Sequence, residues 1–236
     1  MMDREKQRAE ASDGLYGGTR RDQAPDVVRL FPQPNHVFLP GFPSPYRVFE
    51  QRYRALVEDL MKLPEHEQWI AIPRLHRARA DAPGTPSFAR LAAVGRVLHI
   101  HPLPNLQYLL VVGDAHRVHL EEVPSDAPYR QGRVIDRPRA VESQLDDQQE
   151  IRADFERVLQ MVTRMSPSWG EARDTVIKAL KAAPTLEDRI DLLGSLFVQT
   201  VDERQAFLES SWLTDRLSLI EDVLLRGDDS PLLSGF

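Results

Sequence analysis

The sequence predicts an α+β fold, in which a strand-rich first half with one inserted helix precedes a bundle of helices. Three observations carry this prediction. Prolines separate short apolar runs over residues 30–48, before a helical pattern begins. β-branched and apolar runs recur over residues 69–135, and from residue 147 onward apolar side chains return every three to four positions. Strands repeat every two residues and helices every 3.6, so the two halves belong to different structural classes.

Proline shapes the front section. It fixes φ and has no N–H to donate, so residues 30–48 are confined to turns and strand edges. The residues concerned are Pro32, Pro34, Pro40, Pro43 and Pro45, with Gly41 after Pro40. The apolar residues that follow have the spacing of one helix face: Phe49, Tyr53, Leu56, Val57 and Leu60. We therefore expect two extended segments and then a helix over residues 49–62, which ends before Pro64.

The remaining strands of the first half follow this helix. β-branched and apolar runs bounded by Gly, Pro and Asn are typical of strands. The expected strands are residues 69–72, 93–100, 107–112, 117–123 and 129–135. Residues 76–87 are rich in charge, Pro and Gly, which predicts an exposed loop. The second and third strands form a hairpin, and Gly113 and Asp114 are expected to end the third.

Capping signals open the expected helices of the second half. Asp146 and Asp147 precede a stripe of Ile151, Phe155, Val158, Leu159, Val162 and Met165. Further helices are expected to start at residues 168–171, 185–188 and 200–203, where Ser or Thr is followed three residues later by Glu or Asp. The last stripe is Leu213, Leu217, Ile220 and Leu224, and Gly227 is expected to end it. Short connections between amphipathic helices predict an antiparallel bundle.

Composition narrows the class of protein. The chain is 42% hydrophobic and 28% charged with a net charge of −6, and it has no cysteine. No apolar stretch approaches the roughly 20 residues that span a bilayer, and the charged first residues cannot form a signal peptide, so we expect a cytoplasmic protein without a membrane partner. The missing cysteines exclude disulfides, thiol catalysis and thiolate zinc sites. The acidic balance disfavours a nucleic-acid partner. Residues 1–26 are expected to form a flexible tail.

One stretch carries a family resemblance. Residues 30–59 read LFPQPNHVFLPGFPSPYRVFEQRYRALVED, which resembles the start of the Lon substrate-binding domain family, where "LFPLP…LPG…P…IFE.RYR.L" recurs. The matching residues are Leu30, Phe31, Pro32, Pro34, Leu39, Pro40, Gly41, Pro45, Phe49, Glu50, Arg52, Tyr53 and Arg54. Gln51 stands where the family usually has Pro.

The resemblance continues over roughly residues 27–226. In the strands the matching residues are Gly95, Tyr108, Gly113, Arg117, Leu120 and Tyr129, although the spacing from Gly113 to Arg117 is one residue longer than the common form. In the helices they are Leu186, Ile190, Gln205, Leu208, Glu209, Arg216, Leu217 and Leu224. The resemblance implies a small antiparallel β-barrel-like, PUA-like subdomain over residues 27–142 and a helical bundle over 143–227, with a tail at 228–236.

The function that this resemblance implies is recognition without catalysis. A member of this family is expected to bind unfolded or partly folded polypeptides in protein quality control or as an adaptor, and to work with a separate ATP-dependent protease. No Gly-Lys pair occurs, so the chain has no phosphate-binding G-x-x-x-x-G-K-[ST] loop, and we expect no cofactor. A PUA-like RNA-binding or small-ligand-binding module is the alternative. Glu50, Glu58 and Asp59 dilute the local excess of arginine that RNA would need: Arg47, Arg52, Arg54, Arg74, Arg77 and Arg79.

The candidate polypeptide-binding residues are apolar side chains in or beside expected turns: Phe42, Tyr46, Leu103, Leu106 and Tyr108. Two arrangements are open. If these side chains are exposed, they form an apolar patch that binds without strict directionality and tolerates varied sequences. Alternatively, each loop folds back and inserts them into a groove between barrel and bundle.

Other candidate chemistry is weaker. The spacing of His99, His101, His116 and His119 permits a metal site, but no carboxylate is placed to orient the imidazoles, so we expect no metal. Glu50 and the arginines beside it are interpreted as a helix-dipole partner and its ion pairs. There is no G-x-S-x-G elbow, and we expect no catalytic residue.

Overall fold

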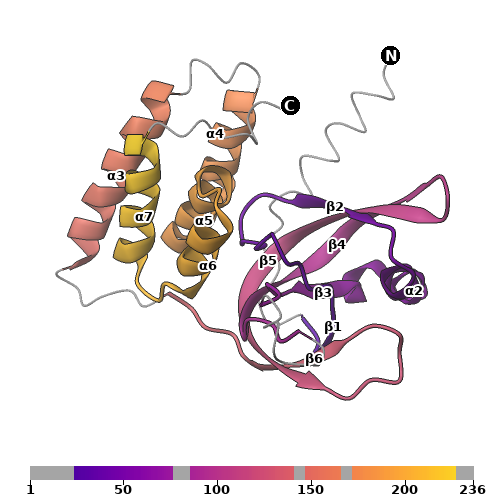
Figure 1. The fold of residues 1–236 in the computed structure, drawn as a ribbon. Coiled ribbons are helices and arrows are strands. Elements are labelled where there is room, and N and C mark those ends of the chain that lie inside the picture. Colours follow the sequence, from indigo (N-terminus) through magenta and orange to yellow (C-terminus); the bar gives the residue numbers. More distant parts are fainter. Residues whose placement is uncertain (1–23, 77–85, 141–146, 166–171, 227–236) are drawn as a thin grey trace, which may run out of the picture. The chain divides into compact units, whose positions relative to one another are not determined.

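The protein is described by a computed structural model over residues 24–76, 86–140, 147–165 and 172–226. The chain divides into two compact units with a boundary between Pro138 and Arg139. The first is built from strands and one α-helix, and the second is helical (Figure 1).

The sheet unit consists, in chain order, of β1 (Val27–Leu30), β2 (Ser44–Val48), α2 (Gln51–Leu60), the short 3-10 turn η2 (Glu65–Glu67), β3 (Trp69–Ile72), β4 (Leu91–Leu103), β5 (Gln107–Val123) and β6 (Gln131–Asp136). The strand order is β2-β5-β4-β3-β1-β6, and β6 also pairs with β5. These pairings run in a ring through β5, β4, β3, β1 and β6, while β2 adds to the side of β5. The predicted α+β fold with a barrel-like sheet is confirmed. The sheet is mixed and not wholly antiparallel as expected, because β1 and β3 are parallel.

The interior of the barrel is filled by small and β-branched side chains around one tryptophan. Trp69 is 1% exposed, and its indole N–H donates to the His66 carbonyl oxygen at 2.9 Å. Every residue of β3 is buried, as expected for a strand covered on both faces. Ala24 also belongs to this core, and the Arg137 guanidinium donates to its carbonyl oxygen at 2.8 Å. Ala24 lies within the stretch that the sequence predicts to be a tail, so the prediction is wrong at this residue; residues 1–23 of the predicted tail lie outside the described residues.

The helix α2 buries four of the five residues of its predicted stripe, and the fifth differs. Tyr53, Leu56, Val57 and Leu60 are buried, whereas Phe49 is 62% exposed. The reason is the helix start: Glu50 has extended dihedral angles (φ −68°, ψ 138°) and is the N-cap, so α2 begins at Gln51. The prediction that Phe49 lies on the helix face is wrong.

The strand β5 is continuous across the Gly-Asp pair that was expected to end it. Arg96 pairs with Gly113 and Val94 with His116, so Asp114 lies in a bulge, with φ 49°. The Arg96 guanidinium donates to Asp114 Oδ2 at 2.6 Å, which holds the bulge in place. The strand bends and continues, and the predicted break is wrong.

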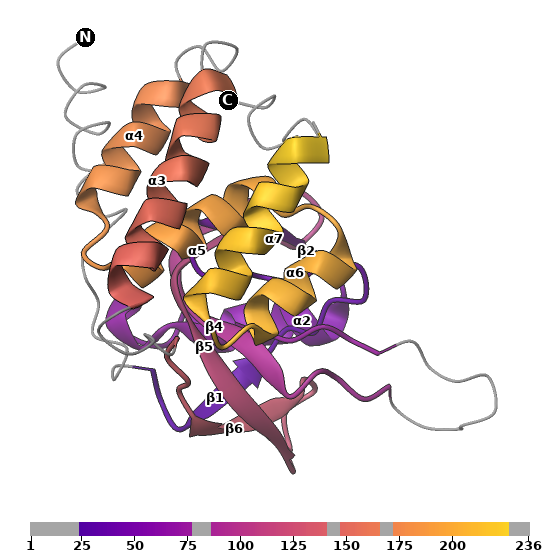
Figure 2. The ribbon, with the colours of Figure 1, turned by 90° about the vertical axis from the view of Figure 1, so that its left-hand side faces the viewer.

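The helical unit contains α3 (Asp147–Met165), α4 (Ala172–Ala182), α5 (Leu186–Phe197), α6 (Val201–Glu209) and α7 (Leu213–Arg226). The helix α7 packs against α3, α5 and α6 (Figure 2). The predicted capping signals at 185–188 and 200–203 are confirmed, because Thr185 Oγ1 accepts from the Asp188 N–H and Thr200 Oγ1 from the Glu203 N–H. The signal at 168–171 and the stop at Gly227 lie outside the described residues.

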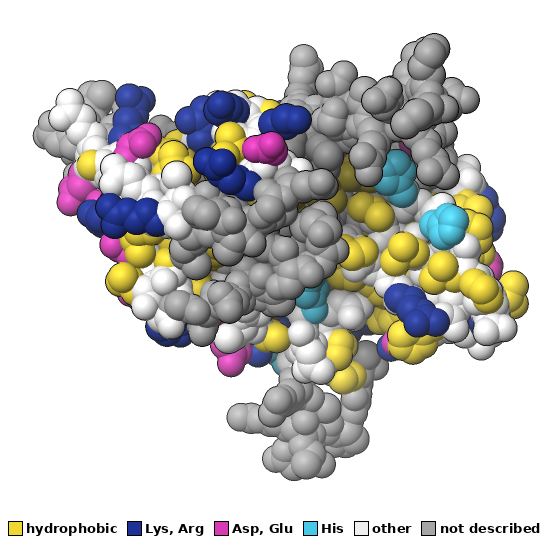
Figure 3. Space-filling model, turned by 90° about the horizontal axis from the view of Figure 1, so that it is seen from above, with side chains coloured by type: hydrophobic (Ala, Val, Ile, Leu, Met, Phe, Trp, Pro, Cys, Tyr) yellow, Lys and Arg dark blue, Asp and Glu magenta, His cyan; other side chains and the backbone are white. Residues whose placement is uncertain are grey.

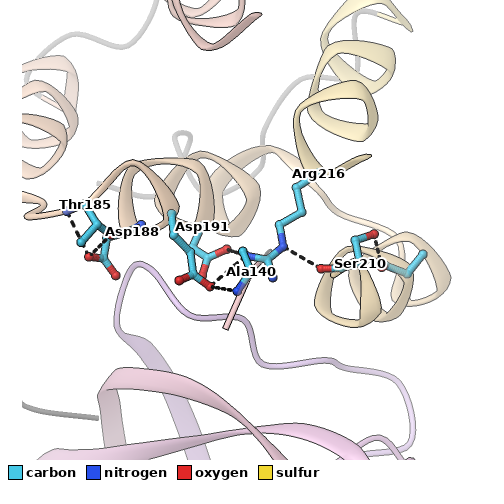
Figure 4. Close-up of polar contacts among 8 residues, drawn as sticks. Ala140, Thr185, Asp188, Asp191, Ser210 and Arg216 are labelled. Atoms are coloured by element: carbon cyan, nitrogen blue, oxygen red, sulfur yellow. Dashed lines mark hydrogen bonds and ion pairs between the residues drawn. The ribbon is translucent and has the colours of Figure 1, made fainter. Parts of the chain in front are cut away.

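A buried ion cluster joins α5 to α7. Arg216 is 1% exposed, and its Nη1 lies 3.2 Å from Glu187 Oε1 and 3.1 Å from Asp191 Oδ1 (Figure 4). Its Nε donates to the Ser210 carbonyl oxygen at 2.9 Å, and Glu187 also accepts the Ala140 N–H at 3.1 Å. These bonds satisfy charges that would otherwise be costly to bury.

Candidate functional site

The longest hairpin of the sheet, formed by β4 and β5, brings the candidate residues together. In the pairing register Leu103 lies opposite Gln107, and Pro102 lies opposite Tyr108. The strand β2 adds to the other side of β5, where Val48 lies opposite Tyr108. Thus β2, β5 and β4 form three adjacent strands, with the hairpin turn and the end of β2 at the same end of the sheet (Figure 1).

The hairpin turn holds a leucine in a backbone conformation that favours glycine. Pro104, Asn105 and Leu106 connect the strands, and the φ angles of Asn105 and Leu106 are 61° and 56°. Asparagine tolerates this left-handed region, but leucine rarely occupies it, and three-residue hairpin loops favour glycine there. Leu106 is nevertheless 73% exposed. Folding therefore carries a local backbone cost while an apolar side chain is presented to solvent.

One side of the three strands is apolar along its middle. Leu110 and Val112 of β5 face the core, so the alternate residues Leu109 and Val111 point to the other side. Residues directly opposite one another share a face, which places the partners of Leu109 and Val111 beside them. We call this surface the hairpin face, and its residues are Pro45, Arg47, His99, His101, Leu103, Gln107, Leu109 and Val111.

The hairpin face is arranged in rows across the strands. Val111 lies between Pro45 and His99, and Leu109 lies between Arg47 and His101. The two central side chains are half-buried, and the flanking residues are exposed. Hydrophobic side chains gather on the part of the sheet unit visible in Figure 3, with histidine and cationic side chains among them.

The charges of the hairpin face are cationic. Neither β2 nor residues 97–112 contain an Asp or Glu, although the whole chain has a net charge of −6. Arg47 Nε donates to Gln107 Oε1 at 2.8 Å, and a neutral amide leaves the guanidinium charge in place. The surface thus combines an apolar strip with one guanidinium and two imidazoles at its sides.

The five predicted binding residues occupy different environments. Leu106 is exposed at the turn, and Leu103 is half-buried on the hairpin face. Tyr108 is half-buried on the opposite side of the hairpin, and Phe42 is half-buried just before β2. Tyr46 is only 8% exposed: its hydroxyl lies 2.9 Å from His36 Nε2, and its ring packs edge-on against aromatic side chains of the same unit. Tyr46 therefore supports β2 from within.

Sequence reasoning missed three residues that the structure places here. Phe49 follows β2 directly and is 62% exposed, at the end of the sheet where Leu106 lies. Leu109 and Val111 form the middle of the hairpin face. A signal for the latter two was present, because residues 108–112 read YLLVV, and an unbroken apolar run makes both faces of a strand apolar.

The four histidines that suggested a metal site are separated. His99 and His101 lie on the hairpin face, and His116 is 5% exposed with its ring 5.8 Å from that of Trp69. His119 lies further along β5, where its Nδ1 is 2.6 Å from Asp136 Oδ1. Within the described ranges, no group of three or more metal-binding side chains comes together.

Polar contacts around α2 stabilise the elements near the site. Arg52 Nη2 lies 2.7 Å from Glu50 Oε2, so the predicted ion pair at the helix start is confirmed. The Tyr129 hydroxyl donates to Asp59 Oδ2 at 2.8 Å. Hydrogen bonds from Lys62 and then from Tyr129 lower the pKa of Asp59, while burial and then the bond to Asp59 raise the pKa of Tyr129.

None of the helices described here has the length and apolar character needed to cross a membrane.

Comparison with known proteins identifies the family. Residues 27–226 match the family described as the ATP-dependent protease La (LON) substrate-binding domain. Lon protease 2 of Myxococcus xanthus is 24% identical over 210 residues, covering 89% of this chain and 25% of the relative; Lon protease of Anaeromyxobacter dehalogenans (strain 2CP-C) is 26% identical, covering 87% and 24%. The chain thus spans about a quarter of the length of these curated relatives.

A solved structure shows the same fold. The N-terminal domain of the Mycobacterium avium complex Lon protease is 15% identical and has a TM-score of 0.61, covering 84% of this chain and 98% of that one. The resemblance predicted from the proline-rich front section is confirmed, because the family match runs from Val27 to Arg226 and includes both units. This chain belongs to the family of ATP-dependent protease La (LON) substrate-binding domains.

Proposed function

We propose that this protein binds unfolded or partly folded polypeptide segments, and that the hairpin face together with Phe49 and Leu106 is the binding surface. The observation that carries the proposal is the exposure of Leu106, 73%, at a backbone position where glycine is favoured. A sequence selected for stability alone would place glycine or a polar residue there. Outliers of this kind concentrate at functional sites.

The chemistry of the surface fits polypeptides of varied sequence. Apolar contact is non-directional, so one surface accepts many side chains. Burying one exposed Leu or Phe side chain contributes about 1.5–3 kcal/mol, so Phe49 and Leu106 are sufficient to make a weak contact substantially stronger. Membership of a substrate-binding family agrees with this use. The binding we propose consumes no ATP and catalyses no reaction, which fits a sequence without a Gly-Lys pair.

We extend the proposal to the biological role. Binding of unfolded segments without chemistry suits an adaptor in protein quality control that delivers polypeptides to a separate ATP-dependent protease. The hairpin face, which has no acidic residue, and the exposed hairpin turn would bind substrates before these reach that protease.

A binding titration tests the proposal. The purified chain is titrated with a fluorescent, permanently unfolded model protein, with the folded form of that protein and with single-stranded RNA, at two salt concentrations. We expect the unfolded form to bind and the folded form not to bind. Leu106→Ser and Phe49→Ser should each weaken binding about 5- to 20-fold, which corresponds to losing part of one buried apolar side chain.

The control is a leucine of the other unit. Leu225 of α7 is 71% exposed, so Leu225→Ser removes a similarly exposed side chain that is not part of the proposed surface. The affinity of Leu225→Ser for the unfolded model protein should equal that of the unchanged protein. Equal loss in Leu106→Ser and Leu225→Ser would refute the proposed surface. Preference for RNA that falls steeply with salt would favour the nucleic-acid alternative instead.

A further inference from the structure

The hairpin face has an electrostatic character that differs from the rest of the chain. It carries Arg47, His99 and His101 and no carboxylate, whereas the protein as a whole has six more acidic than basic residues. These three side chains are not scattered. The register places Arg47 and His101 on opposite sides of Leu109, and His99 beside Val111.

The hydrogen-bond acceptor of Arg47 is a neutral amide, whereas several other arginines of the sheet unit pair with a carboxylate. Arg52 lies 2.7 Å from a Glu50 oxygen, and Arg96 lies 2.6 Å from an Asp114 oxygen. Arg130 pairs with Glu122. Arg47 instead donates one of its five N–H groups to the neutral amide of Gln107. A guanidinium held in this way by a side-chain amide is oriented but not neutralised.

We infer that the hairpin face selects unfolded segments in which acidic residues accompany the apolar ones, and that it discriminates against segments rich in Lys and Arg. This inference rests on the proposed function and specifies its substrate class. An extended segment lying over β5 would place apolar side chains on Leu109 and Val111. Neighbouring strands lie about 4.8 Å apart, so a carboxylate on the same segment reaches the flanking strands.

The flanking groups match a carboxylate by hydrogen bonding as well as by charge. The guanidinium of Arg47 presents further N–H donors, and an imidazole donates at least one N–H in either protonation state. A lysine on the bound segment has no carboxylate to pair with on the hairpin face, and its charge is repelled by that of Arg47. The discrimination thus has an attractive and a repulsive part.

Three matched peptides test this inference. Each has the same apolar residues at alternate positions, accompanied by Asp, Asn or Lys, and each is titrated against the full chain by fluorescence anisotropy. We expect the Asp peptide to bind about 3- to 5-fold more tightly than the Asn peptide, the size of a partly exposed charge pair, and the Lys peptide to bind most weakly. Raising the salt concentration should reduce the spread among the three.

Variants assign the preference to Arg47. Arg47→Gln should remove most of the preference for the Asp peptide over the Asn peptide, and Arg47→Lys should restore part of that preference. Arg133→Gln, an exposed arginine on β6, is the matched control and should behave as the unchanged protein. Circular dichroism checks that each variant is folded.

The outcomes separate the two proposals. Binding of the Asp and Asn peptides with equal affinity overturns the charge preference and leaves the proposed function in place. Failure of all three peptides and of the unfolded model protein to bind overturns both. A preference of undiminished size in Arg47→Gln also overturns the inference, because Arg47 would then contribute nothing to it.

Discussion

At the scale of single residues, Arg216 shows how the helical unit depends on a buried charge. Its guanidinium lies about equally close to Glu187 and Asp191, at 3.2 and 3.1 Å, and all three side chains are buried. Replacement by methionine keeps most of the volume but leaves two carboxylates without their cation. We expect Arg216→Met to lower the free energy of unfolding by about 3–5 kcal/mol, measured by urea denaturation.

The matched control for Arg216 is a surface arginine of the same unit. Arg157 Nε lies 3.0 Å from Glu221 Oε1, but its side chain is 54% exposed. Arg157→Met should lower the free energy of unfolding far less than Arg216→Met does, because solvent screens exposed ion pairs. Similar losses in the two variants would contradict the assignment of a structural role to the buried cluster.

A second residue-scale prediction concerns pH. The folded state lowers the pKa of Asp59, first through the hydrogen bond from Lys62 and then through that from Tyr129. A carboxyl group with a lowered folded pKa contributes stability that is present above its unfolded pKa, about 3.9, and is lost as pH falls through the folded pKa. Asp59→Asn should therefore be less stable than the unchanged protein at pH 7.

The same comparison at low pH provides the check. The two proteins should converge as the pH is lowered below about 4, because the Asp59 carboxyl then becomes neutral in the unchanged protein as well. Thermal unfolding at pH 7, 5 and 3 measures the difference. A stability gap that stays constant with pH would contradict the role of the ionised carboxylate.

At the scale of elements, a substitution in the turn of the β4–β5 hairpin should weaken binding without lowering the stability of the fold. Leu106 has φ 56°, and a side chain in this region costs about 1–2 kcal/mol, whereas glycine adopts it freely but loses more entropy on folding. Leu106→Gly should leave the free energy of unfolding unchanged or raise it by up to about 1 kcal/mol. Binding of unfolded polypeptide should nevertheless weaken, because the exposed side chain is gone.

Urea denaturation and the binding titration together check this hairpin prediction. A variant that is both markedly less stable and weaker in binding would show that Leu106 holds the turn together, and its exposure would then have a structural explanation. Asn105→Gly, at the neighbouring left-handed position, should keep the affinity of the unchanged protein.

Elements were predictable from sequence wherever the cause was local. The capping box at Thr185 and the buried stripe of α2 follow from residues a few positions apart. One position of the family pattern also has a local explanation. Gln51 stands where the family usually has Pro, and it is the first residue of α2. Proline is favoured at the first position of a helix. The start of α2 was misplaced because helical periodicity alone does not show that Glu50 is extended.

The structure could not be predicted from sequence where it depends on contacts between residues that are far apart along the chain. The continuity of β5 depends on Asp114 and Arg96, which are 18 positions apart, and the Arg216 cluster joins residues up to 29 apart. The burial of Tyr46 depends on its packing against Phe31, Phe38 and His36. The hairpin face was missed for the same reason, since its rows exist only once β2 has paired with β5.

At the scale of the whole molecule, the proposed surface belongs to one unit. Every residue of the hairpin face, with Phe49 and Leu106, comes from β2, β4, β5 or their connections. The sequence predicted the fold and the family because the proline-rich front section and the later motifs are contiguous along the chain. The proposed surface is assembled from three strands, so only some of its residues could be predicted from the sequence.

The most direct test of the central claim is to map where an unfolded polypeptide contacts the full chain. A permanently unfolded model protein carrying a photo-activated crosslinker is bound and irradiated, and the linked peptides are identified by mass spectrometry. The account predicts that crosslinks concentrate in residues 44–49 and 97–112, and that Leu106→Ser reduces them while Leu225→Ser does not. Crosslinks concentrated in α6 and α7, or spread evenly over the described surface, would contradict it.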